Sequence, residues 1–198
     1  MRSKANFRTH PIHPMLIPFP IAFLSGTLLF HLISVIFQKV NLWEMGNYLS
    51  IVGIFSAIAA AIPGAIDYFY TVPPNSSGKK HATKHALSNI TSVVLFTSAL
   101  FISFPEPTIS AWAVLGIEML GIAFLVFGGW LGGTLAYRNQ IGVDHRYAGA
   151  GKWKEEYLES RLGERVMVAK PDELKVNQMK LIHLDGKRIV IGRTDKIM

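Results

Sequence analysis

The side chains best able to bind a cofactor are histidines that stand just before two of the apolar runs. His10 and His13 stand in the stretch HPIHP, and His81 and His85 are four residues apart in HATKHALSN. Neutral imidazole is a common ligand of transition metals and of haem iron. We expect His13 and His85 to be the main cofactor ligands, with His10 and His81 as weaker candidates. Haem and a transition metal both fit this pattern, and the identity of the metal stays open.

A plainer interpretation of the same histidines is structural. An imidazole that precedes a helix can cap it or contact lipid headgroups, and we favour this role for His10. For His13 the structural and ligating interpretations are evenly balanced. The chain contains no cysteine, so a thiolate ligand and a [2Fe–2S] cluster held by this chain alone are both excluded.

Four apolar blocks must position these residues. They cover residues 15–37, 48–70, 86–104 and 111–135, each close to the roughly 20 residues that a helix needs to cross a bilayer. Half of the residues are hydrophobic and only 17% are charged. Within the blocks the ionisable side chains are His31, Asp67 and Glu118, whereas soluble helices would carry charged stripes. The sequence therefore predicts an all-α membrane protein with a four-helix transmembrane bundle.

Lysine and arginine indicate the orientation of the bundle. They gather before the first block, between the second and third, and after the fourth. By the positive-inside rule, both termini face the cytoplasm and the protein is a multi-pass protein of the plasma (inner) membrane. The net charge of +7 then reflects topology and lipid headgroup contact, and no nucleic acid partner is expected. The topology brings Asp67 and Tyr137 to the histidine side, with Asn89 one turn deeper than His85.

His31 and Glu118 form a second polar pair near the opposite surface. A rise of 1.5 Å per residue places both of them roughly 9–11 Å below that surface. A single unpaired ionisable group in hydrocarbon is costly, so we expect the two side chains to face each other. A proton or ligand site and a polar clamp between helices are both consistent with this, and we favour the clamp.

Small residues recur at four-residue steps in two of the blocks. Gly128 with Gly132, Gly129 with Gly133, and the series Ser56, Ala60 and Gly64 predict helix packing faces.

After the fourth block the pattern changes. Trp153, Tyr157, Leu158 and Leu162 recur at helical spacing in a surface linker, residues 148–165, which predicts a short cytoplasmic amphipathic segment. In residues 166–198 the run LIHLDGKRIVIGR predicts a β-hairpin with its turn at Asp185 and Gly186.

Several of these stretches together resemble a known family. HPIHPMLIPFPIAF, PGAIDY, HALSN and GGWLGGTLAYRNQIGV are similar to the four-span bacterial membrane family called domain of unknown function 2231, over about residues 8–147. The tail, residues 166–198, resembles the opening strands of a Rieske [2Fe–2S] domain but lacks the cluster ligands. The resemblance implies that His13 and His85 belong to the family's polar signature, with Asp67, Asn89 and Tyr137 beside them.

Two functions follow as expectations. In the first, the chain is a redox-associated membrane module whose histidines bind haem or a metal and whose tail docks a Rieske-type or other electron-transfer protein. In the second, it is a non-catalytic membrane anchor or assembly subunit that recruits a partner through the tail. In either case the bilayer is a partner, self-association is left open, and we expect no catalytic activity in this chain alone.

Overall fold

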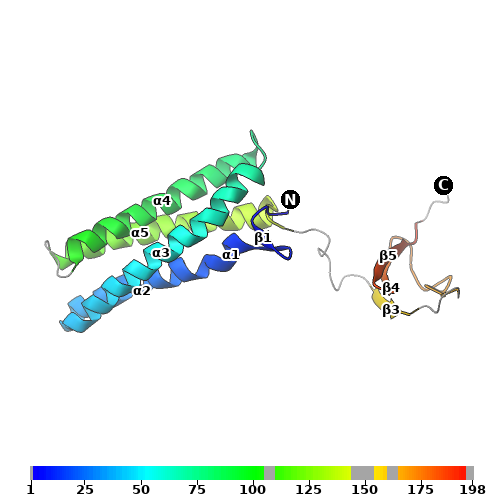
Figure 1. Ribbon diagram of the computed structural model, residues 1–198, viewed down its shortest axis with the longest axis horizontal. Coiled ribbons are helices and arrows are strands. Elements are labelled where there is room, and N and C mark those ends of the chain that lie inside the picture. Colours follow the sequence, from blue (N-terminus) through cyan, green and yellow to red (C-terminus); the bar gives the residue numbers. More distant parts are fainter. Residues whose placement is uncertain (1, 105–109, 144–153, 160–164, 195–198) are drawn as a thin grey trace. The chain divides into compact units, whose positions relative to one another are not determined.

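The computed structural model describes residues 2–104, 110–143, 154–159 and 165–194 (Figure 1). The chain divides into two units, Met1–Asp144 and His145–Met198. The first unit is helical and the second contains a small β-sheet, as the sequence predicts.

Four helical spans make up the first unit, and each is long and apolar enough to cross a membrane. The first span is broken at Ile17, next to Pro18, which begins its longer part. The last span ends in one turn of π-helix. The elements are α1 (Ile12–Leu16) with α2 (Pro18–Phe37), α3 (Val40–Tyr70), α4 (Ser77–Ser103), and α5 (Ala111–Gly133) with η1 (Thr134–Arg138).

The second and third spans begin about two turns earlier than their apolar blocks. Helix α3 starts at Val40 rather than residue 48, and α4 starts at Ser77 rather than residue 86. Polar residues dominate the added turns of α4 and interrupt those of α3, so hydropathy alone places both starts too late. At α4 the side chain of Ser76 caps the helix by accepting a 3.0 Å hydrogen bond from the Lys79 amide.

The helices pair as two hairpins, since the most extensive contacts join α2 to α3 and α4 to α5 (Figure 1). The turn between α2 and α3 is very short because Gln38 adopts a left-handed conformation with φ of 51°. The end of the bundle at which α1 begins and α5 ends is called the N-terminal end below. The end that holds the α2–α3 turn is called the opposite end.

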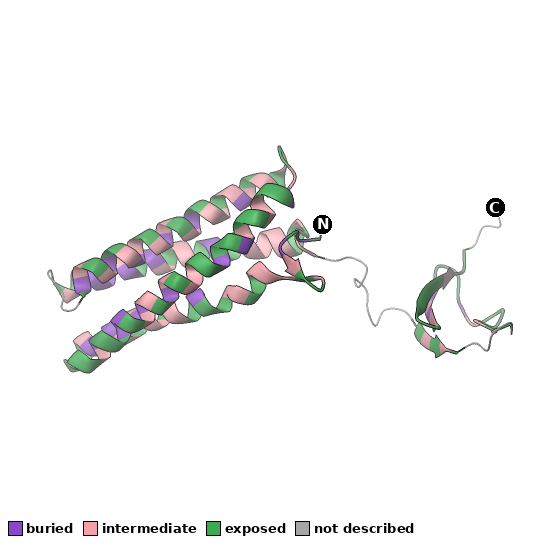
Figure 2. Ribbon diagram, viewed as in Figure 1, coloured by how far each residue is buried: buried purple, intermediate pink, exposed green. Residues whose placement is uncertain are grey.

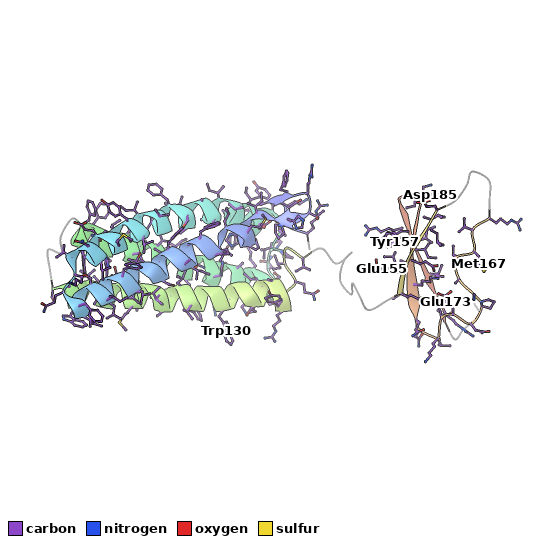
Figure 3. The ribbon with its side chains drawn as sticks, turned by 90° about the horizontal axis from the view of Figure 1, so that it is seen from below. Trp130, Glu155, Tyr157, Met167, Glu173 and Asp185 are labelled. Atoms are coloured by element: carbon purple, nitrogen blue, oxygen red, sulfur yellow. The ribbon has the colours of Figure 1, made fainter. Side chains whose placement is uncertain are left out.

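The bundle is apolar outside, and its interior combines apolar side chains with an unusual number of polar ones. Figure 2 shows exposed residues along the outer sides of the helices, and many of these residues are large and apolar. Trp130, 75% exposed, points away from the helices (Figure 3). Side chains with hydroxyl, amide, imidazole or carboxyl groups are buried between the helices: Thr27, His31, Ser34, Asn47, Ser50, Ser88, Ser92, Ser103 and Glu118. This arrangement suits a lipid environment, in which apolar surface needs no burial and polar groups bond across helices.

Only one of the two glycine stripes on α5 packs closely. A Cβ added to Gly128 would lie 2.7 Å from the amide nitrogen of Asn89, and one added to Gly132 would lie 3.1 Å from His85. A Cβ at Gly129 or Gly133 would meet no atom within 4 Å among the described residues. The expected packing role of the Gly129 and Gly133 pair is therefore wrong, because that side of α5 faces outward.

The tail forms a three-stranded sheet in the order β3 (Lys154–Leu158), β4 (Met179–Leu184), β5 (Lys187–Gly192). Strands β4 and β5 form the predicted hairpin, with Asp185 and Gly186 both at positive φ as a type I′ turn requires. The amphipathic helical pattern is wrong for residues 154–158, which pair in parallel with β4. The spacing of Tyr157 and Leu158 fits a helix locally, but the backbone of this segment pairs with β4 and therefore forms a strand. Trp153 and Leu162 lie outside the described residues.

One face of the sheet is covered by the segment before β4. Lys180 is 1% exposed, and its ammonium group donates to Glu173 at 2.8 Å and to the Val168 carbonyl at 2.9 Å, and pairs with Glu156. Tyr157 lies on the other face, stacked on the His183 ring at 4.2 Å between ring centres. Figure 3 shows Tyr157 and Glu155 on one side of the sheet and Met167 on the other.

Candidate functional site

His13 reaches from α1 to the backbone of α3. Its Nδ1 lies 2.7 Å from the carbonyl oxygen of Ala60. Gly64, one turn further along α3, leaves room for the ring, since a Cβ there would lie 2.9 Å from two imidazole atoms. A carbonyl oxygen can only accept, so Nδ1 of His13 carries a proton and donates it.

His85 repeats this arrangement in the second hairpin. Its Nδ1 lies 2.7 Å from the carbonyl oxygen of Gly128 on α5, and Gly132 stands one turn further along. The side-chain nitrogen of Asn89 donates to the backbone carbonyl of His85 at 2.8 Å and lies 3.3 and 3.5 Å from the two ring nitrogens. In both hairpins, a histidine from the first span thus contacts a backbone carbonyl of the second span. A glycine follows that carbonyl by four residues.

The two rings meet between the hairpins. Their centres are 6.1 Å apart and their planes are nearly perpendicular, at 89°. With Nδ1 protonated on both rings, Nε2 is the nitrogen whose lone pair can bind a metal in the neutral imidazole. At this separation the two imidazoles could together hold one metal ion or haem iron through Nε2.

The ligand set is limited to these two imidazoles. Within the described ranges, no group of three or more histidine, cysteine, aspartate or glutamate side chains could hold a metal. A closed tetrahedral zinc site is thus not formed by the residues the structure describes. Haem iron, which takes four ligands from its porphyrin, and an ion completed by other ligands both match two histidines.

Other residues expected at this site lie apart from the ring pair. His81 Nδ1 lies 3.3 Å from the Asn139 side-chain oxygen, in the turn after η1. His10 is exposed in the short strand β2 (His10–Pro11), which pairs with β1 (Asn6–Phe7). Tyr137 is 87% exposed in η1. Among the described residues, none of these three side chains makes a hydrogen bond or ring contact with His13 or His85.

Asp67 anchors the N-terminal arm, residues 2–11, to the bundle. Its carboxyl accepts hydrogen bonds from the Ser3 hydroxyl at 2.6 and 2.8 Å, from the Thr71 hydroxyl at 2.6 Å, and from the Lys4 amide at 2.9 Å. The Ala5 amide adds a longer bond of 3.3 Å. The role of Asp67 is thus to hold the chain that leads into α1 and His13. No periodic pattern in the sequence indicates this arm.

At the opposite end, His31 and Glu118 face each other as the depth argument predicts. His31 Nδ1 lies 2.7 Å from Glu118 Oε1, and both side chains are 1% exposed. The His31 ring stacks on Trp43 at 4.1 Å, and its Nε2 lies 3.1 Å from the Trp43 carbonyl. The pair therefore joins α2, α3 and α5.

Three residues that the sequence did not single out extend this network to the remaining span, α4. The Trp43 indole donates to the Ser103 carbonyl at 3.3 Å, and the Ser103 hydroxyl donates to the Asn47 side-chain oxygen at 2.9 Å. The spacing of Trp43 and Asn47, four residues apart, was the available signal. Hydropathy does not reveal this spacing, because both residues precede the apolar block at 48–70 and lie where the sequence predicts a loop.

Comparison with known proteins gives one match. The model of the family described as "Predicted membrane protein (DUF2231)" matches residues 9–145. No curated protein and no solved structure matches the chain. The match covers the helical unit and ends before the sheet, so the Rieske resemblance of the tail stays a prediction.

Proposed function

The chain belongs to the DUF2231 family of predicted membrane proteins, and on that premise we propose that it is a redox-associated module that binds haem iron or a transition-metal ion between His13 and His85. In this proposal the protein lies in the plasma membrane with both termini in the cytoplasm. The basic residues around the N-terminal end support that orientation.

The observation that carries the proposal is that both imidazole rings are held by the same kind of hydrogen bond. Each Nδ1 is held 2.7 Å from a helix carbonyl, which is the outer hydrogen bond that ligating histidines usually make. It sets the tautomer, fixes the ring orientation and raises the basicity of Nε2. The bound group would supply one-electron transfer. The hydrogen bonds to the helix backbones would hold the two rings in place.

The tail is proposed to dock an electron-transfer partner, of the Rieske type or another class. The face that carries Tyr157 and His183 supports this, because Met179 and Val190 on the same face are about half exposed. An apolar face with a polar margin is typical of a protein contact. Because the chain has no cysteine, the cluster of a Rieske partner would be held by the other polypeptide.

An absorption spectrum and elemental analysis of the detergent-purified full-length protein test the proposal. We expect a Soret band, or stoichiometric iron or copper, that is lost in both His13→Ala and His85→Ala. His10→Ala is the matched control, because this exposed histidine lies on the same side. Wild-type protein that is folded, colourless and free of metal would contradict the proposal, and so would a bound metal unaffected by both substitutions.

The alternative is a non-catalytic anchor or assembly subunit, and the same hydrogen bonds favour it, since each histidine joins two helices. His13→Asn separates the two functions. An asparagine amide can replace Nδ1 as the donor to Ala60 but cannot replace Nε2 as a ligand. An anchor would keep its stability and its partners in this variant and would lose a pull-down partner when residues 165–198 are deleted. A cofactor protein would keep its fold and lose the bound group.

A further inference from the structure

The buried pair at the opposite end plays no part in the proposed function, and its hydrogen bonds restrict where its protons lie. His31 Nε2 is 3.1 Å from the Trp43 carbonyl, which can only accept, so Nε2 carries a proton. If the pair is neutral overall, one further proton lies in the 2.7 Å contact between His31 Nδ1 and Glu118 Oε1. This proton belongs either to the imidazole or to the carboxyl group.

The second carboxyl oxygen distinguishes these two arrangements. Glu118 Oε2 is buried and has no hydrogen-bond partner among the described residues. In a carboxylate this oxygen would share the negative charge, and burying it without a donor would be costly. In a carboxylic acid with its proton on Oε1, Oε2 is a neutral carbonyl oxygen and its burial costs much less. Among the described residues the protein supplies Oε2 with no donor, and a single neutral water would satisfy a carboxylic acid but would leave a buried carboxylate poorly solvated, so the acid is favoured.

Ser50 provides a second buried group of the same kind. Its hydroxyl oxygen also lacks a partner in the part of the chain that the structure describes. The His31 ring packs against Gly46, and Ser50 lies four residues further along the same face of α3. Ser50 thus lies about one helical turn, or about 5.4 Å along α3, from the residue that meets the His31 ring. One buried water is a common partner for polar groups that the protein leaves unpaired.

We propose that Glu118 holds the shared proton as a carboxylic acid that donates to a neutral His31, and that one water molecule binds between Glu118 Oε2 and Ser50 Oγ. The water donates to Oε2 and exchanges a second hydrogen bond with the serine hydroxyl. The remaining members of the network, Trp43, Asn47 and Ser103, already have partners. The result is a hydrated proton site within the apolar span of the bundle, separate from the histidine pair at the N-terminal end.

Infrared spectroscopy of the detergent-solubilised full-length protein tests both parts. Protonated carboxyl groups absorb in a carbonyl region apart from carboxylates, and near neutral pH exposed acids do not contribute there. We expect a band in wild-type protein that disappears in Glu118→Gln and persists in Glu44→Gln, which alters an exposed acid on α3. Ser50→Ala should shift this band to higher frequency through loss of the hydrogen bond to Oε2. Ser56→Ala, which removes a half-buried hydroxyl from the same helix, should leave it in place.

The two parts fail in different ways. A wild-type spectrum without an acid band would overturn the proposed proton position. A band that Ser50→Ala leaves unshifted would overturn the water site. If Glu118→Gln does not fold, wild-type protein labelled with ¹³C in its glutamate side chains replaces it. The band must then shift with the label, and an unshifted band would contradict its assignment to a glutamate.

Discussion

Gly64 stands against the imidazole of His13 so closely that a Cβ on residue 64 would lie 2.9 Å from the ring atoms Cε1 and Nδ1. Gly132 stands in the same relation to His85, at 3.1 Å. Each glycine follows by four residues the carbonyl that accepts the histidine's hydrogen bond. The small residues of this bundle therefore do more than bring helices together, because they open the space through which an imidazole reaches a helix backbone.

Gly64→Ala should lower the melting temperature of the protein in detergent. Overpacking costs about 1–3 kcal/mol, which exceeds the gain of up to about 1 kcal/mol from alanine in a helix. Gly129→Ala is the control, since its Cβ would meet no described atom within 4 Å. We expect this control to be neutral or slightly stabilising. Equal effects of the two substitutions would show that the His13 ring moves aside without cost.

Glu118→Ala should destabilise the bundle strongly. It leaves Nδ1 of His31 buried without its 2.7 Å partner. An unsatisfied buried polar group costs about 1–3 kcal/mol, and the cavity left by the deleted side chain adds to this loss. The double variant His31→Leu with Glu118→Leu removes both polar groups and should recover most of this loss. Thermal unfolding of the three proteins in one detergent gives the comparison. A double variant as unstable as the single one would mean that the wider network with Trp43 requires His31.

The sequence predicts the pairing of His31 with Glu118 because the helix rise per residue places both side chains at the same depth. The same reasoning brings His13 and His85 to one depth. It does not predict the arm held by Asp67, whose bonds to Ser3 and to the Lys4 amide join residues more than 60 positions apart. Strand β3 was missed for a related reason, because its pairing with β4 is a long-range contact that overrides the local spacing of Tyr157 and Leu158.

Asp67→Asn should release the N-terminal arm. The carboxyl accepts from the amides of Lys4 and Ala5, and a hydrogen bond to a charged group contributes about 1.5–3 kcal/mol. Hydrogen–deuterium exchange of a peptide covering residues 2–11 should become at least about tenfold faster. Glu44→Gln, at the exposed far end of the same helix, should leave exchange in the arm unchanged. Continued protection in Asp67→Asn would show that the β1–β2 hairpin holds the arm by itself.

The stability of the tail sheet should depend on pH through Glu173. Hydrogen bonds from the side chains of Lys154 and Lys180, and from the Lys170 amide, lower the pKa of this carboxyl from 4.5 to about 2. The folded-state pKa lies below the unfolded value, so the stabilisation is complete above pH 4.5. It is lost as the pH falls from 4.5 towards 2.

Amide NMR signals of Ile182 and its neighbours, recorded on the labelled full-length protein in micelles, follow this loss directly. In wild-type protein the dispersed sheet signals should weaken across that acid range. Glu173→Gln should be less stable near neutral pH and should lack this part of the pH dependence, because its amide cannot form charged pairs with Lys154 and Lys180. Glu159→Gln, a change at an exposed acid beside β3, should behave like wild type. Loss of the sheet at the same pH in wild type and in Glu173→Gln would assign the acid sensitivity to other groups, and the buried ammonium of Lys180 would then depend mainly on Glu156.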